Sequence, residues 1–425
     1  MDATGYVKGL ATAARAAALA LASSTGAQRN AALLACAAAI RKARPALQAA
    51  NAKDLARKDE FGLSHAMVDR LRLTDKVVEG MAVALEQIAA QTDPVGQTIS
   101  AANRPDGLRV EKRRVPIGVI GIIYESRPNV TADAAGLCLK SANACILRGG
   151  KEAINSNLAI AAAIREGLAV AGLPATAVTV IDNPDHAIVT AMATAEGLID
   201  LIVPRGGHEL IEAVAQAATI PVIKHYAGNC HVYIHSAADL DMAERIVLNA
   251  KCQRPGVCNA METLLVDKAV AGRFLPRVAA ALLAKGVELR MDDEGLEIAR
   301  PSVQPASAIK RADESDWYTE YLDLILAVRV VDSLEAAIDH INTFGSRHTD
   351  GIVTESLAAA EKFVQQVDSS SVMINASTRL SDGGVYGLGA EVGISTDKLH
   401  ARGPMGAEDL TTYKWIVTGR GHVRG

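Results

Sequence analysis

Residues 116–131 have the sequence PIGVIGIIYESRPNVT, in which an apolar strand breaks into a polar loop. Gly118 and Gly121 interrupt the strand, at positions where glycine lets a second backbone or a ligand approach. Further β-branched runs follow at helix-length intervals, at residues 144–147, 178–181, 199–203 and 220–223. Strands that alternate with helices predict right-handed crossovers and an open parallel sheet. The expected fold class is therefore α/β.

Polar residues follow the first of these strands. Open α/β sheets bind ligands beyond the carboxyl ends of their strands, and Arg127 and Asn129 lie at such an end. The structural alternative for Asn129 is an ordinary helix N-cap, a common use of asparagine. The loop is therefore a candidate ligand site.

Two other strand ends combine glycines with a cation ahead of a helix, an arrangement that suits an anion. Their residues are Arg148, Gly149, Gly150 and Lys151 in the first turn, and Arg205, Gly206 and Gly207 in the second. Two such turns on one sheet favour a dinucleotide, which has several phosphates. The chain has no G-x-G-x-x-G after a strand. The nearest imitation, GLGAEVG at residues 387–393, has the wrong spacing and is expected to be a flexible loop.

The remainder of the chain has three parts. The first ~95 residues show an apolar period of 3.6 and are expected to be helical. Residues 101–114 are polar and carry the dipeptide Asp106-Gly107, which predicts a hairpin; it is either a solvated surface hairpin or one that reaches a partner subunit. A second α/β unit is expected after about residue 228, with strands at residues 232–235, 263–266, 324–331 and 372–375. Gly, Tyr413, Trp415 and Ile416 near the end predict a terminal strand.

The chain has 425 residues, a net charge of −4 and an estimated pI of 6.2. Its length predicts two or more domains. Its charge implies no general attraction to nucleic acid or to a membrane surface. Six cysteines without a C-x-x-C pair are typical of reduced thiols in a cytoplasmic enzyme. No uncharged run reaches the roughly 20 residues of a membrane span, and no signal peptide is expected.

Cys258 is the candidate nucleophile. It lies in NAKCQRPGVCNAMETLLV, residues 249–266, in a loop between a helix and a strand that also holds Arg254. A nearby cation and exposed backbone N–H groups favour the thiolate that attacks. The rival nucleophile is Cys230, flanked by Asn229 and His231, and a purely structural thiol is the other alternative for Cys258.

Histidines provide two weaker hypotheses. His225, His231 and His235 could suggest a metal site, but no carboxylate lies near them in sequence, and no metal is expected. His348 and Asp350 could belong to a catalytic triad, but no nucleophile elbow of the G-x-S-x-G type accompanies them. Residues 345–350 are therefore interpreted as a structured turn.

Together these segments resemble the γ-glutamyl phosphate reductases, which belong to the aldehyde dehydrogenase superfamily. The resemblance runs in order over nearly the whole chain, and it is most specific in QRPGVCN (253–259) and HINTFGSRHTDGIVT (340–354). It implies two open, mostly parallel α/β domains and a small oligomerisation arm. The corresponding residues are 1–100 and 115–227 for a nicotinamide-cofactor domain, 228–404 for a catalytic domain, and 101–114 and 405–425 for the arm.

The resemblance also implies residue roles. Cys258 falls at the catalytic cysteine, and Asn129 at the asparagine that helps to hold the oxyanion. Glu320 resembles the glutamate that binds the nicotinamide ribose. Arg148 and Lys151 fall beside the adenosine ribose and its 2′-phosphate, favouring NADPH, and Arg205, Gly206 and Gly207 border the pyrophosphate. Arg127 and Arg254 are candidates for binding the substrate.

Hydrolytic members of the superfamily carry a glutamate that activates water, and His225 stands at that position here. This difference is expected if the acyl-enzyme is meant for hydride or phosphate. The implied reaction is NADPH-dependent reduction of L-glutamyl 5-phosphate to L-glutamate 5-semialdehyde in proline biosynthesis, through a cysteine thioester. The alternatives are an acylating dehydrogenase that uses a coenzyme A thioester, and a non-catalytic chain that assembles with a kinase. The implied partners are further copies of the chain and, transiently, glutamate 5-kinase.

Overall fold

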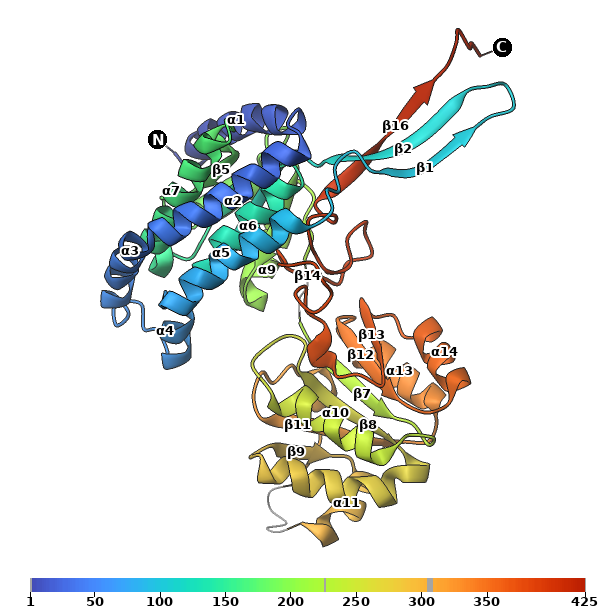
Figure 1. Ribbon diagram of the computed structural model, residues 1–425. Coiled ribbons are helices and arrows are strands. Elements are labelled where there is room, and N and C mark those ends of the chain that lie inside the picture. Colours follow the sequence, from blue (N-terminus) through green and yellow to red (C-terminus); the bar gives the residue numbers. More distant parts are fainter. Residues whose placement is uncertain (1, 225–226, 304–308, 425) are drawn as a thin grey trace. The chain divides into compact units, whose positions relative to one another are not determined.

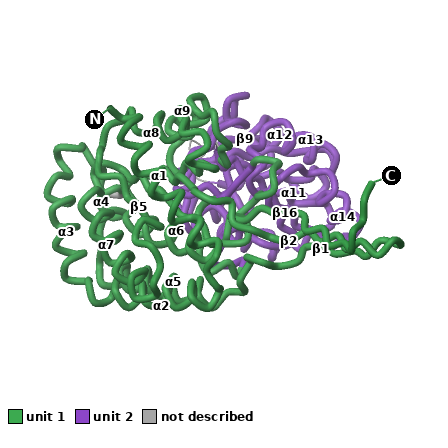
Figure 2. The backbone as a smooth tube through the Cα atoms, turned by 90° about the horizontal axis from the view of Figure 1, so that it is seen from above, with its two compact units in different colours: residues 1–224, 387–393, 397–425 green, residues 225–386, 394–396 purple. Residues whose placement is uncertain are grey.

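The computed structural model describes residues 2–224, 227–303 and 309–424. Its two compact units are drawn in different colours in Figure 2. Unit 1 comprises Met1–Lys224, Gly387–Gly393 and Asp397–Gly425, and unit 2 comprises His225–Tyr386 and Ile394–Thr396. His225 itself, predicted to replace the hydrolytic glutamate, lies outside the described residues.

Unit 1 contains a parallel four-stranded sheet with the order β5-β4-β3-β6. Its strands are β3 (Val119–Tyr124), β4 (Ala144–Arg148), β5 (Val178–Val180) and β6 (Leu201–Arg205). Its helices are α1 (Ala3–Ala22), α2 (Gly26–Lys42), α3 (Arg44–Ala56), α4 (His65–Leu71), α5 (Asp75–Ala90), α6 (Asn129–Lys140), α7 (Ile154–Val170), α8 (Ala187–Ala193) and α9 (His208–Ala217) (Figure 1). This arrangement confirms the predicted helical start and the α/β fold class.

Alanine and glycine allow the helices of unit 1 to pack closely. A Cβ atom added to Gly167 on α7 would lie only 2.4 Å from the backbone nitrogen of Cys36 on α2. No larger residue fits there without moving a backbone, so α2 and α7 approach each other at this glycine. Only 3% of the residues in the chain are aromatic, which is consistent with such tightly stacked helices.

The predicted hairpin is confirmed. Strands β1 (Thr98–Asn103) and β2 (Arg109–Pro116) are antiparallel, and Gly107 in the turn has a φ of +85°. The predicted terminal strand is β16 (Thr411–Thr418), which pairs antiparallel with β2. These three strands form a separate sheet that extends away from the helices of unit 1 (Figure 1).

Unit 2 contains a parallel seven-stranded sheet with the order β10-β9-β11-β8-β7-β12-β13. Its strands are β7 (Cys230–Ile234), β8 (Met261–Asp267), β9 (Glu288–Met291), β10 (Ile309–Arg311), β11 (Ile325–Val331), β12 (Thr349–Val353) and β13 (Ser371–Ile374). Its helices are α10 (Leu240–Cys252), α11 (Lys268–Ala284), α12 (Asp293–Ala299), α13 (Leu334–Phe344) and α14 (Leu357–Gln366). Two further short strands of the chain are β14 (Ile394–Ser395) and β15 (Gly403–Pro404).

Helices cover the two faces of the unit 2 sheet. Helices α10, α11 and α12 share one hydrophobic core with β11 residues Leu326, Val328 and Val330. Helices α13 and α14 share another core with Val331. Because successive strand residues point to opposite faces, Arg329 lies on the same face of β11 as Val331.

Three details differ from the sequence predictions. Residues 220–223 form only an isolated bridge, Ile202 to Val222, because Pro221 lacks the N–H that a continuing ladder needs. Strands β9 and β10 were not predicted, since both are short and rich in charged residues.

The third difference concerns the domain boundary, because residues 387–393 and 397–404 were predicted to belong with the second domain. Contacts place them in unit 1, where Glu391 pairs with Arg205 and the Val392 N–H donates to the Met405 carbonyl. Separately, no helix within the described ranges is long and apolar enough to cross a membrane.

Candidate functional site

Three candidate loops of unit 1 meet at one edge of its sheet. Register pairs Ile123 of β3 with Arg148 of β4, and Tyr124 of β3 with Arg205 of β6. The segments that follow these strands therefore begin side by side at the carboxyl edge, where parallel sheets bind ligands. The structure thus brings together the loop of Arg127 and Asn129 and both glycine turns, as the sequence predicted for a single sheet.

Asn129 begins helix α6, and its side chain has a defined direction. Its Nδ2 donates a hydrogen bond to Oδ2 of Asp133, one turn further along the helix, at 3.1 Å. An amide nitrogen carries two hydrogens, so one hydrogen of Asn129 remains for another acceptor. Arg127 is exposed in the same loop.

Asp133 is an unusual partner for this amide. Burial raises the pKa of its carboxyl to about 6, although the Asn129 hydrogen bond and the charge of Arg205 oppose the rise. The nearby carboxylate of Glu391 raises the pKa further. The orientation of Asn129 is therefore linked to a group that titrates near neutral pH.

The first glycine turn holds a buried cation. Arg148 is only 7% exposed; its Nη2 donates to the Pro184 carbonyl at 3.2 Å, and its Nε is buried without a partner among the described residues. Burial lowers the pKa of this guanidinium. Lys151 is exposed, with its Nζ 5.4 Å from the centre of the Phe61 ring. The turn therefore offers one buried and one exposed cation beside Gly149.

The second glycine turn already holds a carboxylate. The Gly207 N–H, at the start of α9, donates to Oε1 of Glu125 at 2.8 Å. A Cβ atom on Gly206 would lie 2.6 Å from that same oxygen, so a larger residue there would displace the Glu125 carboxylate. Arg205 forms an ion pair with Glu391 at 3.6 Å. The turn thus accommodates an anionic group against bare backbone.

In unit 2, Cys258 lies at the amino ends of the strands, whereas the unit 1 loops lie at the carboxyl ends of theirs. It precedes β8, as Gly228 precedes β7, and the two strands begin in register at Cys230 and Met261. A Cβ atom on Gly228 would lie 1.9 Å from the Cys258 carbonyl oxygen, so glycine is required there. The thiol of Cys258 is partly exposed. The candidate nucleophile therefore lies in a loop at the amino edge of its sheet.

Cys230, the rival nucleophile, supports this loop. Its Sγ donates to the Cys258 carbonyl oxygen at 3.2 Å, and it is fully buried. Burial, followed by the charge of Asp350, raises the pKa of the Cys230 thiol well above its usual value. Burial also raises the pKa of Cys36, to about 12. These thiols are poor nucleophiles because the thiolate is the reactive form.

Arg379 is a cation that sequence analysis missed. It lies 121 residues after Cys258 in the chain, in the 3-10 turn Thr378–Leu380, yet its charge interacts with that of Cys258. Its Nε donates to Gln253 at 2.9 Å, and its Nη1 donates to Asn259. It therefore holds the cysteine loop on both sides. Burial, followed by the like charge of the exposed Arg254, lowers the pKa of Arg379.

Glu320 meets the cysteine loop through Gly228. Its Oε1 accepts a hydrogen bond from the Gly228 N–H at 2.8 Å, so the structure brings together the surroundings of Cys258 and Glu320. A neighbouring carboxylate, Glu262, accepts from the Leu322 N–H at 3.3 Å and forms a fully buried ion pair with Lys251 at 2.6 Å. This buried pair fixes the segment that carries Glu320.

Two of the candidate histidines, His231 and His348, are buried in unit 2. His231 is fully buried, and its Nδ1 lies 2.8 Å from Oδ1 of Asp350. His348 is also buried, with Nδ1 2.8 Å from the Thr349 hydroxyl. Among the residues that the structure describes, no three His, Cys, Asp or Glu side chains are grouped as a metal site would need.

Comparisons with known proteins agree with this arrangement. The model of the aldehyde dehydrogenase family matches residues 4–299. A γ-glutamyl phosphate reductase from Thermotoga maritima is 44% identical, over 98% of this chain and 99% of its own, with a TM-score of 0.94. A γ-glutamyl phosphate reductase from Saccharomyces cerevisiae is 32% identical over 98% of both chains, with a TM-score of 0.52.

More distant structures share the fold. An acetylating aldehyde dehydrogenase from Geobacillus thermoglucosidasius is 19% identical, over all of this chain and 98% of its own, with a TM-score of 0.71. This level of identity supports the fold alone. The two reductases are similar enough, over nearly their whole lengths, to place the chain more narrowly. The chain belongs to the aldehyde dehydrogenase family and, within it, to the γ-glutamyl phosphate reductases.

Proposed function

We propose that the chain catalyses the NADPH-dependent reduction of L-glutamyl 5-phosphate to L-glutamate 5-semialdehyde, with release of phosphate, in proline biosynthesis. The observation that carries this proposal is the partly exposed Cys258 thiol in a loop held by Arg379 and adjoining Glu320. A thiol nucleophile suits this reduction, because the thioester that it forms accepts hydride far more readily than a carboxylate does.

Membership of the aldehyde dehydrogenase family implies a nicotinamide cofactor. Unit 1 has residues that fit one: the buried, unpartnered Nε of Arg148, and the Gly207 N–H that already binds a carboxylate. Arg148 and Lys151 would hold a 2′-phosphate, Gly149 would allow close approach beside them, and Arg205, Gly206 and Gly207 would border the pyrophosphate. By correspondence with the family, Glu320 would bind the nicotinamide ribose. When bound, the cofactor supplies the hydride.

The residues of the chain perform the acyl transfer. The Cys258 thiolate, favoured by the charge of Arg379, attacks the acyl carbon. By correspondence with the family, the Cys258 N–H and the Asn129 side chain would stabilise the oxyanion, and removing one such donor typically costs ~3 kcal/mol of barrier. Phosphate leaves with the electron pair of the broken C–O bond, and the acyl group stays on Sγ as a thioester. Arg127 and Arg254 would bind anionic groups of the substrate.

Asp133 would direct this oxyanion donor. By accepting one hydrogen of the Asn129 amide, its carboxylate leaves the other hydrogen in a fixed direction. A charged acceptor makes the stronger bond, so the ionised form of Asp133 holds the amide best. Asp133 is a positioning residue in this proposal.

The three-stranded arm is proposed to join copies of the chain. All six residues of β1 are exposed, as are Tyr413 and Trp415 on β16, at 47% and 59%. Exposed aromatic residues on a sheet are typical of an interface. Two finer proposals follow from the pathway: a transient contact with glutamate 5-kinase, and a cytoplasmic location. A reducing cytoplasm suits a chain with six cysteines and no disulfide among the residues that the structure describes.

The deciding experiment measures phosphate-dependent reduction of NADP⁺ with L-glutamate 5-semialdehyde. Wild-type protein and Cys252→Ala, which removes the other partly exposed thiol, should be active, and Cys258→Ala should be inactive. Turnover with coenzyme A thioesters and none with phosphate would replace the proposal with an acylating dehydrogenase. Absence of both activities and of NADPH binding would indicate a non-catalytic chain.

A further inference from the structure

The buried ion pair of Lys251 and Glu262 has no part in the reaction proposed above. Its Nζ and Oε2 atoms are 2.6 Å apart, and both side chains are fully buried. Taking two charges out of water costs about as much as their attraction returns, so replacing such a pair with apolar residues is often neutral. The pair is therefore weak evidence for stability, and its place in the fold is the better guide to its role.

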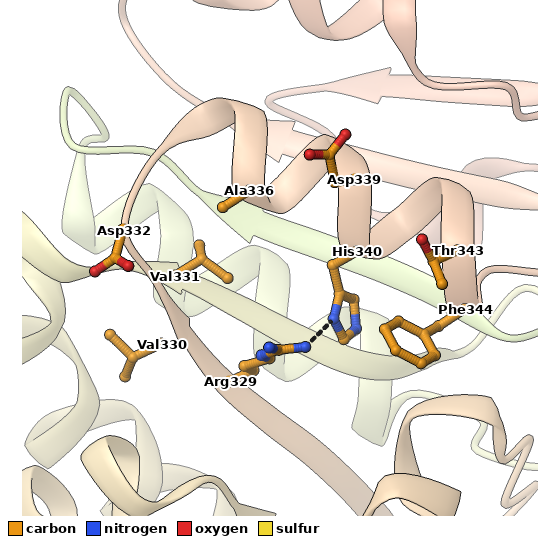
Figure 3. A pocket seen from close by; sticks show the side chains of 9 residues that line it. All are labelled: Arg329, Val330, Val331, Asp332, Ala336, Asp339, His340, Thr343 and Phe344. Carbon is orange, nitrogen blue, oxygen red and sulfur yellow. Dashed lines mark hydrogen bonds between the residues drawn. The ribbon is translucent and has the colours of Figure 1, made fainter.

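Another buried polar group of unit 2 avoids this cost by being neutral. His340 lies beside the cavity of about 340 Å³ drawn in Figure 3, and its Nδ1 accepts a hydrogen bond from Nη1 of Arg329 at 2.9 Å. Burial lowers the pKa of His340 to about 2, so its ring carries no charge. Burial also raises the pKa of Glu262 and lowers that of Lys251, but the attraction between the two charges opposes both shifts. Each charge thus depends on the other residue being in place.

The pair joins the two ends of the loop that carries Cys258. Lys251 lies in the last turn of α10, and Glu262 is the second residue of β8. The chain between them contains Cys258 and also Gln253, which accepts a hydrogen bond from Arg379. Because the two side chains meet, they fix the separation of the end of α10 and the start of β8, between which the loop is held.

Glu262 also contacts the segment that carries Glu320. Its second oxygen, Oε1, accepts a hydrogen bond from the Leu322 N–H at 3.3 Å. Leu322 has a φ of +55°, in the left-handed region that residues other than glycine rarely adopt. Such a conformation persists only where the surrounding structure holds it. The Glu262 carboxylate provides one of the contacts that hold it, two residues after Glu320.

The two residues before Leu322 are bonded elsewhere in unit 2. Glu320 accepts from the Gly228 N–H at 2.8 Å, and the Tyr321 hydroxyl donates to Oδ1 of Asp316 at 2.7 Å. Three consecutive residues are therefore bonded to three different parts of the unit. Of these bonds, the one to Glu262 leads to the ends of the cysteine loop.

We propose that Lys251 and Glu262 are positioning residues that hold the loop of Cys258 and the segment of Glu320 in a fixed relation. This inference rests on the proposed function, because it takes Cys258 as the nucleophile and Glu320 as a cofactor ligand. Neither member of the pair touches substrate or cofactor. Glu262 acts on the cofactor through Leu322 and Glu320, and the ion pair acts on the thiol through the two ends of its loop.

Two double variants separate these effects from stability. The first, Lys251→Met with Glu262→Leu, removes both the ion pair and the bond to Leu322. The second, Lys251→Met with Glu262→Gln, removes the ion pair and keeps an amide oxygen that can accept from the Leu322 N–H. Urea unfolding shows that each protein is folded, and the first should have a midpoint close to that of wild type.

Titration of NADPH fluorescence measures the cofactor contact without turnover. The first double variant should bind NADPH about fivefold more weakly, as expected for the loss of one hydrogen bond. The second should bind it within about twofold of wild type, because the bond to Leu322 is kept. In both, kcat at saturating NADPH should fall about tenfold, because the loop that places the thiol is no longer held at its ends. A purely structural pair would not give this difference between binding and kcat.

A matched control makes the same substitutions in another pair of unit 2. Lys268 and Glu294 are partly exposed and 3.0 Å apart. Lys268→Met with Glu294→Leu should change neither NADPH binding nor kcat. Glu262→Asp is a milder variant, because it keeps a charge beside Lys251 and shortens the reach to Leu322 by one methylene group. It should bind NADPH about fivefold more weakly, and it provides the test if an apolar pair does not fold.

The outcomes distinguish this inference from the proposed function. Wild-type affinity for NADPH in the folded first double variant, or in Glu262→Asp, would overturn the inference alone. Equal losses in the control at Lys268 and Glu294 would also overturn it. Wild-type protein that binds no NADPH would reject the proposed function, and the inference with it.

Discussion

The thiol of Cys230 donates a hydrogen bond to the backbone carbonyl of Cys258, with 3.2 Å between sulfur and oxygen. The two cysteines therefore differ in their surroundings, since Cys230 begins strand β7 and Cys258 lies in the loop before β8. Cys230 is buried and its pKa is raised, whereas Cys258 is partly exposed beside a cation. The buried thiol thus supports the backbone of the proposed nucleophile.

Removing each thiol should separate the support given by Cys230 from the attack proposed for Cys258. Cys258→Ala should lose about a thousandfold or more of turnover, because it removes the nucleophile. Cys230→Ala should cost about fivefold, the size of one neutral hydrogen bond to the loop. The measurement is kcat for phosphate-dependent NADP⁺ reduction, with iodoacetamide labelling to count reactive thiols. A Cys230→Ala protein as inactive as Cys258→Ala would contradict this division.

Arg379 should control the reactivity of Cys258. Arg379→Met removes a cation that favours the thiolate, so alkylation by iodoacetamide at pH 7 should slow by about tenfold. Arg379→Lys keeps the charge and should restore most of the rate. Arg245→Met, which removes an exposed cation from α10, is the matched control and should alkylate at the wild-type rate. Equal rates in all four proteins would remove Arg379 from the site.

Asp133 should give the reaction a pH dependence. Its pKa is raised to about 6, so above pH 6 the carboxylate is ionised and holds Asn129, and below pH 6 it is protonated and holds it less firmly. Turnover should therefore fall as the pH drops through about 6. The facing charges are Arg205 and Glu391.

Asp133→Asn should remove this inflection, giving a lower kcat that is flat between pH 5 and 8, with an unchanged KM for the semialdehyde. A parallel loss at all pH values with the inflection intact would show that Asp133 does not position Asn129.

The free energy of unfolding should also depend on the ionisation of Asp133, and it should fall as the pH rises. An acid whose folded pKa is raised keeps its proton in the folded state after the unfolded chain has lost its own. Asp133 therefore makes the protein less stable as the pH rises from about 4 to 6, and it has no further effect above that window. Urea unfolding of wild-type protein and Asp133→Asn at both ends of the window measures this difference.

Arg148 and Lys151 should determine the choice of cofactor. Replacing both with methionine removes the cations proposed to contact a 2′-phosphate, so the Michaelis constant for NADPH should rise much more than that for NADH. The ratio of kcat/KM for the two cofactors is the measurement, and NADH is its internal control. An unchanged ratio would reject this assignment.

Removing one member of the buried pair Lys251 and Glu262 should lower the free energy of unfolding strongly, whereas replacing both with apolar residues should change it little. Burial raises the pKa of Glu262 and lowers that of Lys251, because each charge has left water. Glu262→Ala leaves a buried lysine without its partner and should lower the free energy of unfolding by about 3–5 kcal/mol. The double variant Lys251→Met with Glu262→Leu should recover most of that loss. Urea unfolding of the three proteins gives the comparison, and a double variant less stable than Glu262→Ala would contradict it.

Local sequence determined most of the helices and strands. It also determined which candidate residues lie at the ends of strands. Alternating β-branched and alanine-rich segments were enough to predict most of β3 to β6, and Asp106-Gly107 was enough to predict the hairpin. These features depend on neighbours within a few residues, so they can be recognised without tertiary structure. The glycine turns after β4 and β6 were predicted for the same reason.

Tertiary structure alone decided which distant residues meet. Arg379 reaches the loop of Cys258 across more than a hundred residues, Glu125 occupies the start of α9, and the buried Cys230 thiol bonds to the Cys258 carbonyl. Strand β9 gains its place from pairing with β11, and β10 from pairing with β9, and their charged residues gave no apolar signal. Such contacts depend on sheet order and chain crossovers, which bring together residues that no local pattern relates.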